Sequence, residues 1–156
     1  MEKLQSQISL FQVSEISISY KPNFKACERP QVCSSKDIHS ILYHNWDQNK
    51  IEFQEQFKIV LLNRANKVLG ISEISTGGFA GTVADPKVIF STALKACASS
   101  IILSHNHPSG NLKPSQADLQ LTKKIKNGGE LLDIAVLDHL IITADSYLSF
   151  ADEGLI

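Results

Sequence analysis

Two runs near the start of the chain have recognisable patterns of apolar and polar residues. Val13–Tyr20 places apolar side chains at every second position of its second half, which predicts a half-buried strand. A proline-containing connector follows, and apolar residues then recur at helical spacing as far as about Asn49. Either Ser35 or Asp37 would cap that helix, because a short polar side chain accepts a free backbone N–H of the first turn. The apolar stripe of the helix consists of Ile38, Ile41, Leu42 and Trp46.

The patterns after Asn49 indicate further strands and helices. Apolar runs bounded by turn residues predict strands, and apolar residues at helical spacing predict helices. The predicted elements are strands at Glu55–Asn63 and Val68–Ser75, a helix opened by Asp85-Pro86, a strand at Ile101–Leu103, a helix from Ser115 to about Asn127, and strands at Leu131–Leu137, Leu140–Thr143 and Tyr147–Phe150. Gly128-Gly129 is expected to end the last helix. This order predicts an α/β fold in which helices cover a mixed β-sheet.

The composition suits one globular domain. At 156 residues the chain is long enough to bury a core, and contents of 43% hydrophobic and 20% charged residues are ordinary for a soluble protein. The net charge of −1 gives no general attraction to nucleic acid or to an anionic membrane. No stretch approaches the roughly 20 apolar residues of a membrane span, and the N-terminus lacks the apolar core of a signal peptide. We therefore expect a cytoplasmic protein without a membrane partner, whose cysteines are reduced thiols: Cys27, Cys33 and Cys97.

The stretch after the apolar run Ile101–Leu103 contains a candidate metal site. His105 and His107 are two residues apart, so their side chains point to the same face at the end of the predicted strand. A proline and a glycine then break the strand, and the next helix has Asp118 in its first turn. Two histidines and a carboxylate with an open fourth position are a usual ligand set for catalytic zinc. The alternative is a polar turn followed by a capping box of Ser115 and Asp118, although the second residue of such a box is usually Glu or Gln.

These residues resemble the JAMM metalloprotease motif, which is His-x-His-Pro, six residues, Ser, two residues and Asp. The matching positions, which keep every spacing, are His105, His107, Pro108, Ser115 and Asp118. The fuller string His-Asn-His-Pro-Ser-Gly is similar to the RadC branch of the JAB/MPN family, and the resemblance extends from about Glu55 to the C-terminus.

The resemblance implies a fold and a domain organisation. The fold would be that of the JAB/MPN family, which has a deaminase-like layout. Residues 1–156 would form one domain, with a family-variable N-terminal strand and helix in 1–49 and the metal-binding core in 50–156.

The resemblance also implies a chemistry. His105, His107 and Asp118 would bind one Zn²⁺, and a metal-activated water would hydrolyse an amide bond in a peptide or isopeptide substrate. Ser115 would donate a hydrogen bond to the tetrahedral oxyanion, as its counterpart does in JAMM peptidases. Asp138-His139, which RadC relatives also carry, would have a structural or metal-adjacent role without being a ligand.

Glu55 occupies an unusual position for a carboxylate. By strand alternation it shares an apolar face with Phe53, Phe57 and Ile59, whereas the intervening residues form a polar face. A carboxylate in an apolar row is costly unless it has a partner, so Glu55 either reaches water at the strand end or is a base held beside the metal. The resemblance implies the second role, because JAMM enzymes place a Glu near the start of this strand.

Three other functions are weighed against hydrolysis. A DNA-processing or DNA-binding repair accessory protein, which the family's association with DNA repair suggests, needs a basic groove or a second carboxylate cluster. The net charge of −1 argues against it, and the basic residues that could form a local patch are Lys21, Lys25, Arg29, Lys123, Lys124 and Lys126. A non-catalytic scaffold is opposed by the complete motif. A zinc deaminase requires His-x-Glu and Pro-Cys-x-x-Cys, and neither occurs.

Overall fold

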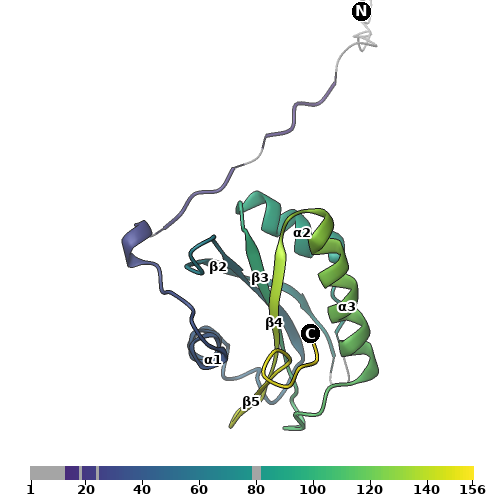
Figure 1. Cartoon of the computed structure of the whole chain (residues 1–156). Coiled ribbons are helices and arrows are strands. Elements are labelled where there is room, and N and C mark those ends of the chain that lie inside the picture. The colour runs from purple at the N-terminus through teal and green to yellow at the C-terminus, as the bar shows by residue number, and fades with distance from the viewer. Residues whose placement is uncertain (1–12, 18, 24, 79–81) are drawn as a thin grey trace, which may run out of the picture.

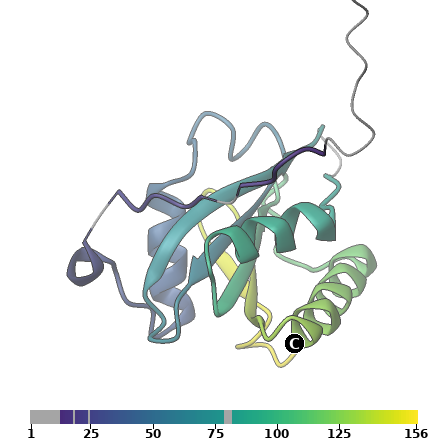
Figure 2. The same ribbon diagram turned by 90° about the horizontal axis from the view of Figure 1, so that it is seen from above.

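The computed structural model describes residues 13–17, 19–23, 25–78 and 82–156. The elements are a short 3₁₀ helix η1 (Ala26–Glu28), α1 (Ser35–His44), β1 (Gln56–Leu62), β2 (Val68–Thr76), α2 (Pro86–Lys95), β3 (Ser100–Asn106), α3 (Gln116–Leu131), β4 (Ala135–Ile142) and β5 (Tyr147–Ser149). They form a mixed five-stranded sheet with α1 on one face and α2 and α3 on the other (Figures 1 and 2). The predicted α/β fold with helices covering a mixed sheet is confirmed.

The strand order β2-β1-β3-β4-β5 places β3 at the centre of the sheet. β3 pairs antiparallel with β1 and parallel with β4, and every residue of β3 is buried. A strand covered on both faces needs a continuous apolar run, and Ile101–Leu103 supplies it. The polar end of β3 is therefore also buried at the centre of the molecule.

Two apolar cores lie on the two faces of the sheet. Phe57, Ile59 and Leu61 of β1 pack with α2 and α3, as their predicted common face requires. Val60 and Leu62 pack on the other face with α1. The polar face predicted for β1 is also buried. Gln56 is 1% exposed and donates to Glu73 of β2, and Lys58 is 7% exposed and lies over Trp46 in the turn after α1. Phe53 lies outside the shared face, since β1 begins only at Gln56.

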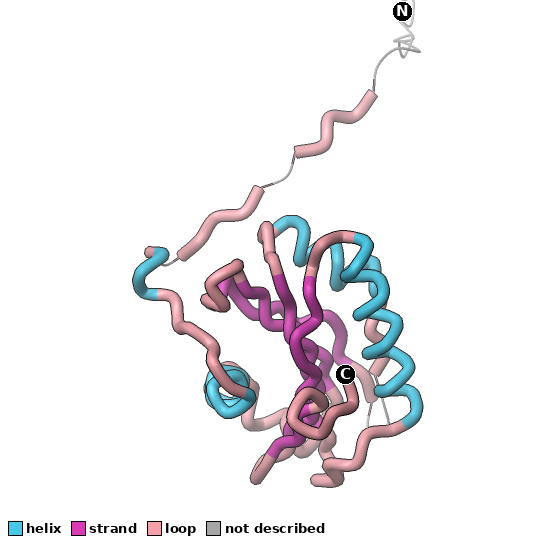
Figure 3. Tube along the Cα trace, in the orientation of Figure 1, coloured by secondary structure: helices cyan, strands magenta, loops and turns pink. Residues whose placement is uncertain are grey.

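The segment before α1 differs from the sequence prediction. Among its described residues no strand forms between Val13 and Tyr20, and Ile16 is 87% exposed, while Ile18 lies outside the described part (Figure 3). The hydroxyl of Tyr20 donates to the carbonyl of Leu69 at 3.0 Å. Leu69 is available because it is an extra residue in β2, where the pairing with β1 shifts register. The sequence pattern gave no indication that β2, at this edge of the sheet, contains a β-bulge.

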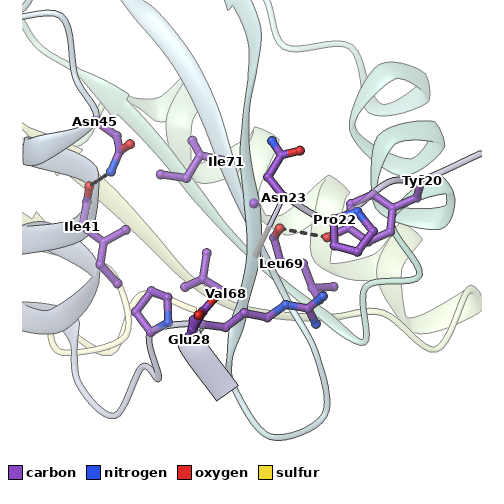
Figure 4. A pocket seen from close by; sticks show the side chains of 12 residues that line it. Tyr20, Pro22, Asn23, Glu28, Ile41, Asn45, Val68, Leu69 and Ile71 are labelled. Carbon is purple, nitrogen blue, oxygen red and sulfur yellow. Dashed lines mark hydrogen bonds between the residues drawn. The ribbon is translucent and has the colours of Figure 1, made fainter. Parts of the chain in front are cut away.

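A cavity of about 430 Å³ separates this N-terminal segment from α1 and β2 (Figure 4). Tyr20 and Pro22 lie on one side of it, Ile41 lies on the opposite side, and Ile71 belongs to β2 between them. Neither histidine of the candidate metal site lines it.

The ends of α1 also differ from the prediction. The N-cap is Ser34, whose side chain accepts from the backbone N–H of Asp37, and Asp37 completes a capping box. The helix ends at His44, about five residues before the predicted end at Asn49. Asn45 terminates it because its side-chain amide donates to the Ile41 carbonyl at 2.8 Å, which competes with helical hydrogen bonding.

The two strands predicted at Leu131–Leu137 and Leu140–Thr143 are one strand, β4. Asp138 and His139 therefore lie inside a strand and not between two strands. The pairing with β3 shifts register beside Leu137, which is 39% exposed. Asp138 is tolerated in the buried interior because it accepts from the Ser149 hydroxyl at 2.6 Å and from the Ala151 backbone N–H at 2.9 Å.

α3 passes through Gly128-Gly129 without ending there. A Cβ at Gly129 would overlap the carbonyl oxygen of Ile134, and the backbone N–H of Ile134 donates to the Gly129 carbonyl at 2.9 Å. The glycine therefore permits close contact between α3 and the start of β4. Among the described residues, no helix combines the length and the apolar character that crossing a bilayer requires.

We predict that Gly129→Ala destabilises the protein by about 1–3 kcal/mol, because overpacking against a backbone atom outweighs the gain of about 1 kcal/mol in helix propensity. Gly128→Ala is the matched control, since its Cβ would meet only the ring of Phe90, a side chain that can move. Urea unfolding of both variants measures the difference. Equal stability of the two variants would contradict this role of Gly129.

Candidate metal centre

The two histidines of the motif meet at the end of β3. His105 lies in the strand opposite Phe57 of β1 and Ile141 of β4, and His107 continues the strand direction by donating its backbone N–H to the Ile142 carbonyl at 2.9 Å. Strand alternation then brings the two rings to one side, where their Nε2 atoms are 3.0 Å apart. His105 is 1% exposed, while His107 is half-buried.

α3 brings the carboxylate of Asp118 to the same point. Asp118 Oδ1 is 3.4 Å from His105 Nε2, and Asp118 Oδ2 is 3.9 Å from His107 Nε2. A tetrahedral zinc ion with bonds of about 2.0–2.1 Å holds its ligand atoms roughly 3.3 Å apart. The two shorter separations are close to this value, the longest one involves the other oxygen of Asp118, and the donor set is one that zinc accepts. The group His105, His107 and Asp118 could therefore hold a metal ion.

Ser115 positions Asp118 through the first turn of α3. The Ser115 side chain accepts from the Asp118 backbone N–H at 3.1 Å, and Asp118 Oδ2 accepts from both the backbone N–H and the hydroxyl of Ser115 at 2.7 Å. This is a capping box with Asp in place of the usual Glu or Gln. The two interpretations of these residues are thus compatible, because the capping box leaves Oδ1 directed at His105.

A chain of hydrogen bonds determines which nitrogen of His105 carries the proton. The Thr122 hydroxyl donates to the Asp118 carbonyl at 2.7 Å, so its oxygen is left to accept from His139 Nδ1 at 2.6 Å. His139 Nε2 must then accept, at 2.8 Å, from His105 Nδ1. His105 consequently presents an unprotonated Nε2 at the candidate metal position.

His107 reaches the same tautomer by a shorter route. Its Nδ1 donates to the backbone carbonyl of Asn111, which can only accept, and so its Nε2 is also left with a free lone pair. Both histidines therefore present the ring nitrogen that a metal requires, on the side where Asp118 lies.

Burial keeps the rings of His105 and His139 neutral. Burial lowers the pKa of His105 to about 4, although the nearby Asp118 carboxylate opposes this effect. Burial, followed by the charges of His105 and His107, holds the pKa of His139 well below its ordinary value. Near neutral pH neither ring carries a charge, and the neutral imidazole is the form that binds metals.

Glu55 lies just before β1 and is half-buried. Burial raises the pKa of its carboxyl group, and the negative charge of Asp118 raises it further, while His107 and the Thr82 backbone N–H lower it. The carboxyl group is thus close enough to His107 and Asp118 for both charges to affect its protonation. It is not one of the three grouped ligand residues.

Three other polar residues around the site were not identified as functional from the sequence. Thr122 orients His139, Asn111 orients His107, and Asn106 contacts the segment that carries Glu55. The role of Thr122 could have been inferred from the sequence, because it lies one helical turn after Asp118 and a threonine hydroxyl readily donates to the carbonyl four residues earlier. The Asn111 contact uses a backbone carbonyl and has no signature in the sequence.

Cysteines and histidines elsewhere in the described residues lie outside this group. Cys27, Cys33 and Cys97 are exposed free thiols. His39 is on α1, on the opposite face of the sheet, where its ring stacks on Tyr147 at a centroid distance of 4.3 Å. His44 is exposed at the end of the same helix and interacts with the Ser40 carbonyl.

Comparisons with known proteins place the sequence in a family. The sequence matches the family model described as RadC-like JAB domain over residues 32–155. It is 47% identical over 125 residues to a UPF0758 protein of Flavobacterium johnsoniae, an alignment that covers 80% of this chain and 53% of the relative. A UPF0758 protein of Methanosarcina barkeri is 37% identical over 126 residues, covering 81% and 54%.

A UPF0758 protein of Clostridium kluyveri is 35% identical over 144 residues, covering 92% of this chain and 61% of the relative. The chain spans about half the length of the curated relatives it matches. The family model covers most of the chain, residues 32–155. The chain belongs to the family of RadC-like JAB domains.

Proposed function

We propose that the protein is a zinc-dependent metallopeptidase or isopeptidase that hydrolyses an amide bond. The observation that carries this proposal is the convergence of His105 Nε2, His107 Nε2 and an Asp118 carboxylate oxygen beside the half-buried Glu55. Membership of a JAB domain family supports it, whereas the names of the relatives state no activity. A role in DNA repair and a cytoplasmic location remain predictions from the sequence.

His105, His107 and Asp118 would hold the metal, with one position left for water or substrate. A zinc ion bound there would supply Lewis acidity and would lower the pKa of a bound water to about 7. The protein contributes two imidazoles whose Nδ1 atoms already have hydrogen-bond acceptors, which directs both Nε2 atoms to the metal position. No proton has to be displaced from either Nε2 when a metal binds.

Glu55 would move the proton. A carboxylate near the attacking water accepts its proton and then delivers it to the leaving nitrogen, as general base and then general acid. The pKa of Glu55 is raised mainly by burial, which brings the group closer to the range in which it can both accept and release a proton. A strand-end Glu that simply reached water would have no such shift.

Ser115 would stabilise the charge that develops on the carbonyl oxygen. It is exposed next to Asp118, and its hydroxyl now donates to Asp118 Oδ2. Rotation of this hydroxyl would redirect the donor to a substrate while the Ser115 backbone N–H retains Oδ2. Loss of one such donor costs about 2.7–4 kcal/mol of barrier in a well-studied protease.

Metal content is the first prediction. We expect about one zinc per chain in the purified protein, because the donor set is complete, and loss of that zinc in Asp118→Ala. Glu130→Ala, which removes an exposed carboxylate from the same helix, serves as the control and should retain the zinc. Elemental analysis of the folded proteins decides. A folded wild type that takes up no divalent metal on titration would refute the proposal.

The hydrogen-bond chain gives a second prediction. Thr122→Val keeps the size of the side chain but removes the acceptor of the His139 Nδ1 proton, so zinc affinity should fall by about 10–100-fold. Thr122→Ser retains the hydroxyl and should bind zinc like the wild type. Competition with a chromogenic chelator gives both affinities. Unchanged affinity in Thr122→Val would show that this chain does not orient His105.

The roles of Glu55 and Ser115 give a third prediction. Glu55→Gln should retain zinc and lose hydrolysis by at least about 100-fold. Ser115→Ala should also retain zinc, with a rate lower by about 100–1,000-fold. A panel of isopeptide-linked and linear peptides, read by mass spectrometry, supplies the rates. Full activity in either zinc-loaded variant would exclude the role assigned to that residue.

A further inference from the structure

Asn106 lies between the two candidate ligands, and its side chain points to the opposite face of β3. Alternation along the strand sends His105 and His107 to one side and Ser104 and Asn106 to the other. Asn106 is 0% exposed. A buried amide group must find hydrogen-bond partners in the protein, and the identity of those partners indicates what it does.

All the partners of the Asn106 side chain are main-chain groups of one segment. Its Oδ1 accepts from the backbone N–H of Gln56 at 2.7 Å. Its Nδ2 donates to the carbonyls of Ile51 at 2.8 Å and Gln54 at 2.9 Å. Two of these three groups belong to the residues immediately before and after Glu55.

Ser104 shows that burial alone does not account for these contacts. It lies two residues earlier on the same strand and the same face, it is also 0% exposed, and its hydroxyl has no hydrogen-bond partner. A buried polar side chain on this face can therefore remain without a partner, so burial alone does not explain the hydrogen bonds of Asn106. The Asn106 amide makes three hydrogen bonds to residues that lie 50 to 55 positions earlier in the sequence.

The Glu55 backbone is held from a second side. The N–H of Gly77 donates to the Glu55 carbonyl at 2.8 Å, and the N–H of Glu55 donates to the Gly78 carbonyl at 3.4 Å. Gly77 and Gly78 follow β2, whereas Asn106 belongs to β3, so Glu55 is fixed between two neighbouring parts of the sheet. The Asn106 contacts join the residues on both sides of Glu55 to the strand that carries the histidines, in addition to the pairing of Phe57 with His105.

We propose that Asn106 is a positioning residue that sets the distance between Glu55 and the candidate ligands His105 and His107. His105, Asn106 and His107 are consecutive, and they supply both candidate ligands and the amide that holds the Glu55 segment. Any shift of the end of β3 therefore moves the ligands and the Glu55 segment together. The proposal rests on the function proposed above for Glu55. A displacement of about 1 Å in such an arrangement can cost about 100-fold in rate.

The test uses the full chain loaded with Co²⁺, whose visible absorption reports the surroundings of the metal without a substrate. Asn106→Thr and Asn106→Ser remove the amide without changing the charge near the metal, and threonine suits a strand if the serine variant folds poorly. Ser104→Ala is the matched control. Glu55→Gln and the double variant Glu55→Gln/Asn106→Thr complete a cycle that measures coupling between the two residues.

We expect every variant to bind one equivalent of Co²⁺. Glu55→Gln should shift the pH midpoint of the cobalt spectrum, the Asn106 variants should shift it in the same direction, and Ser104→Ala should leave it unchanged. The double variant should shift it no further than Glu55→Gln alone, because Asn106 acts only through Glu55. For a peptide cleaved by the zinc-loaded protein, Asn106→Thr should lower kcat by up to about 100-fold with little change in KM.

Four results would overturn the proposal. If Glu55→Gln shifts the spectrum and the Asn106 variants do not, Asn106 has no part in positioning, and the proposed function is unaffected. If the shifts add in the double variant, or the Asn106 variants bind no Co²⁺, Asn106 acts on the ligands and not on Glu55. If Glu55→Gln itself leaves the spectrum unchanged, the role proposed for Glu55 fails, and the positioning role fails with it.

Discussion

Burial of His105 is the constraint on which the candidate site depends. A ring that is 1% exposed has to satisfy both of its nitrogens inside the protein. His139 on β4 provides the partner of Nδ1, and Phe57 on β1 lies parallel to the ring, with an interplanar angle of 7°. Both neighbours are available because β3 is the central strand. The fold thus turns Nε2 of a neutral histidine toward His107 and Asp118, at the point where α3 begins.

The parts of the site that follow local rules could be predicted from the sequence. Two residues separated by one in a strand share a face, and this is enough to bring His105 and His107 together. A polar residue three positions before Asp118 predicts a helix start, and the structure has its N-cap at Ser115. The apolar runs likewise predicted strands at β1 and β3, because burial on both faces requires continuous apolar residues, whereas β4 was predicted as two strands.

The contacts that complete the site could not be predicted, because they join residues distant in the sequence. His105 and His139 are 34 residues apart, and His139 and Thr122 are 17 residues apart. The bulge beside Leu137 in β4 and the close approach at Gly129 misled the sequence prediction for the same reason. A glycine near the end of a helical pattern is ambiguous until the neighbouring strand is in place, since it suits both a helix end and a close contact.

The capping box at the start of α3 narrows the amino acids that these two positions accept. For the helix alone, Asp or Asn at position 115 would cap as well as Ser115 does, but an aspartate would place a second negative charge beside Asp118. Glu at position 118 is the commoner capping residue, yet its extra methylene would move the carboxylate away from His105. The same two side chains therefore serve the helix start and the candidate site, and a substitution at either position acts on both at once.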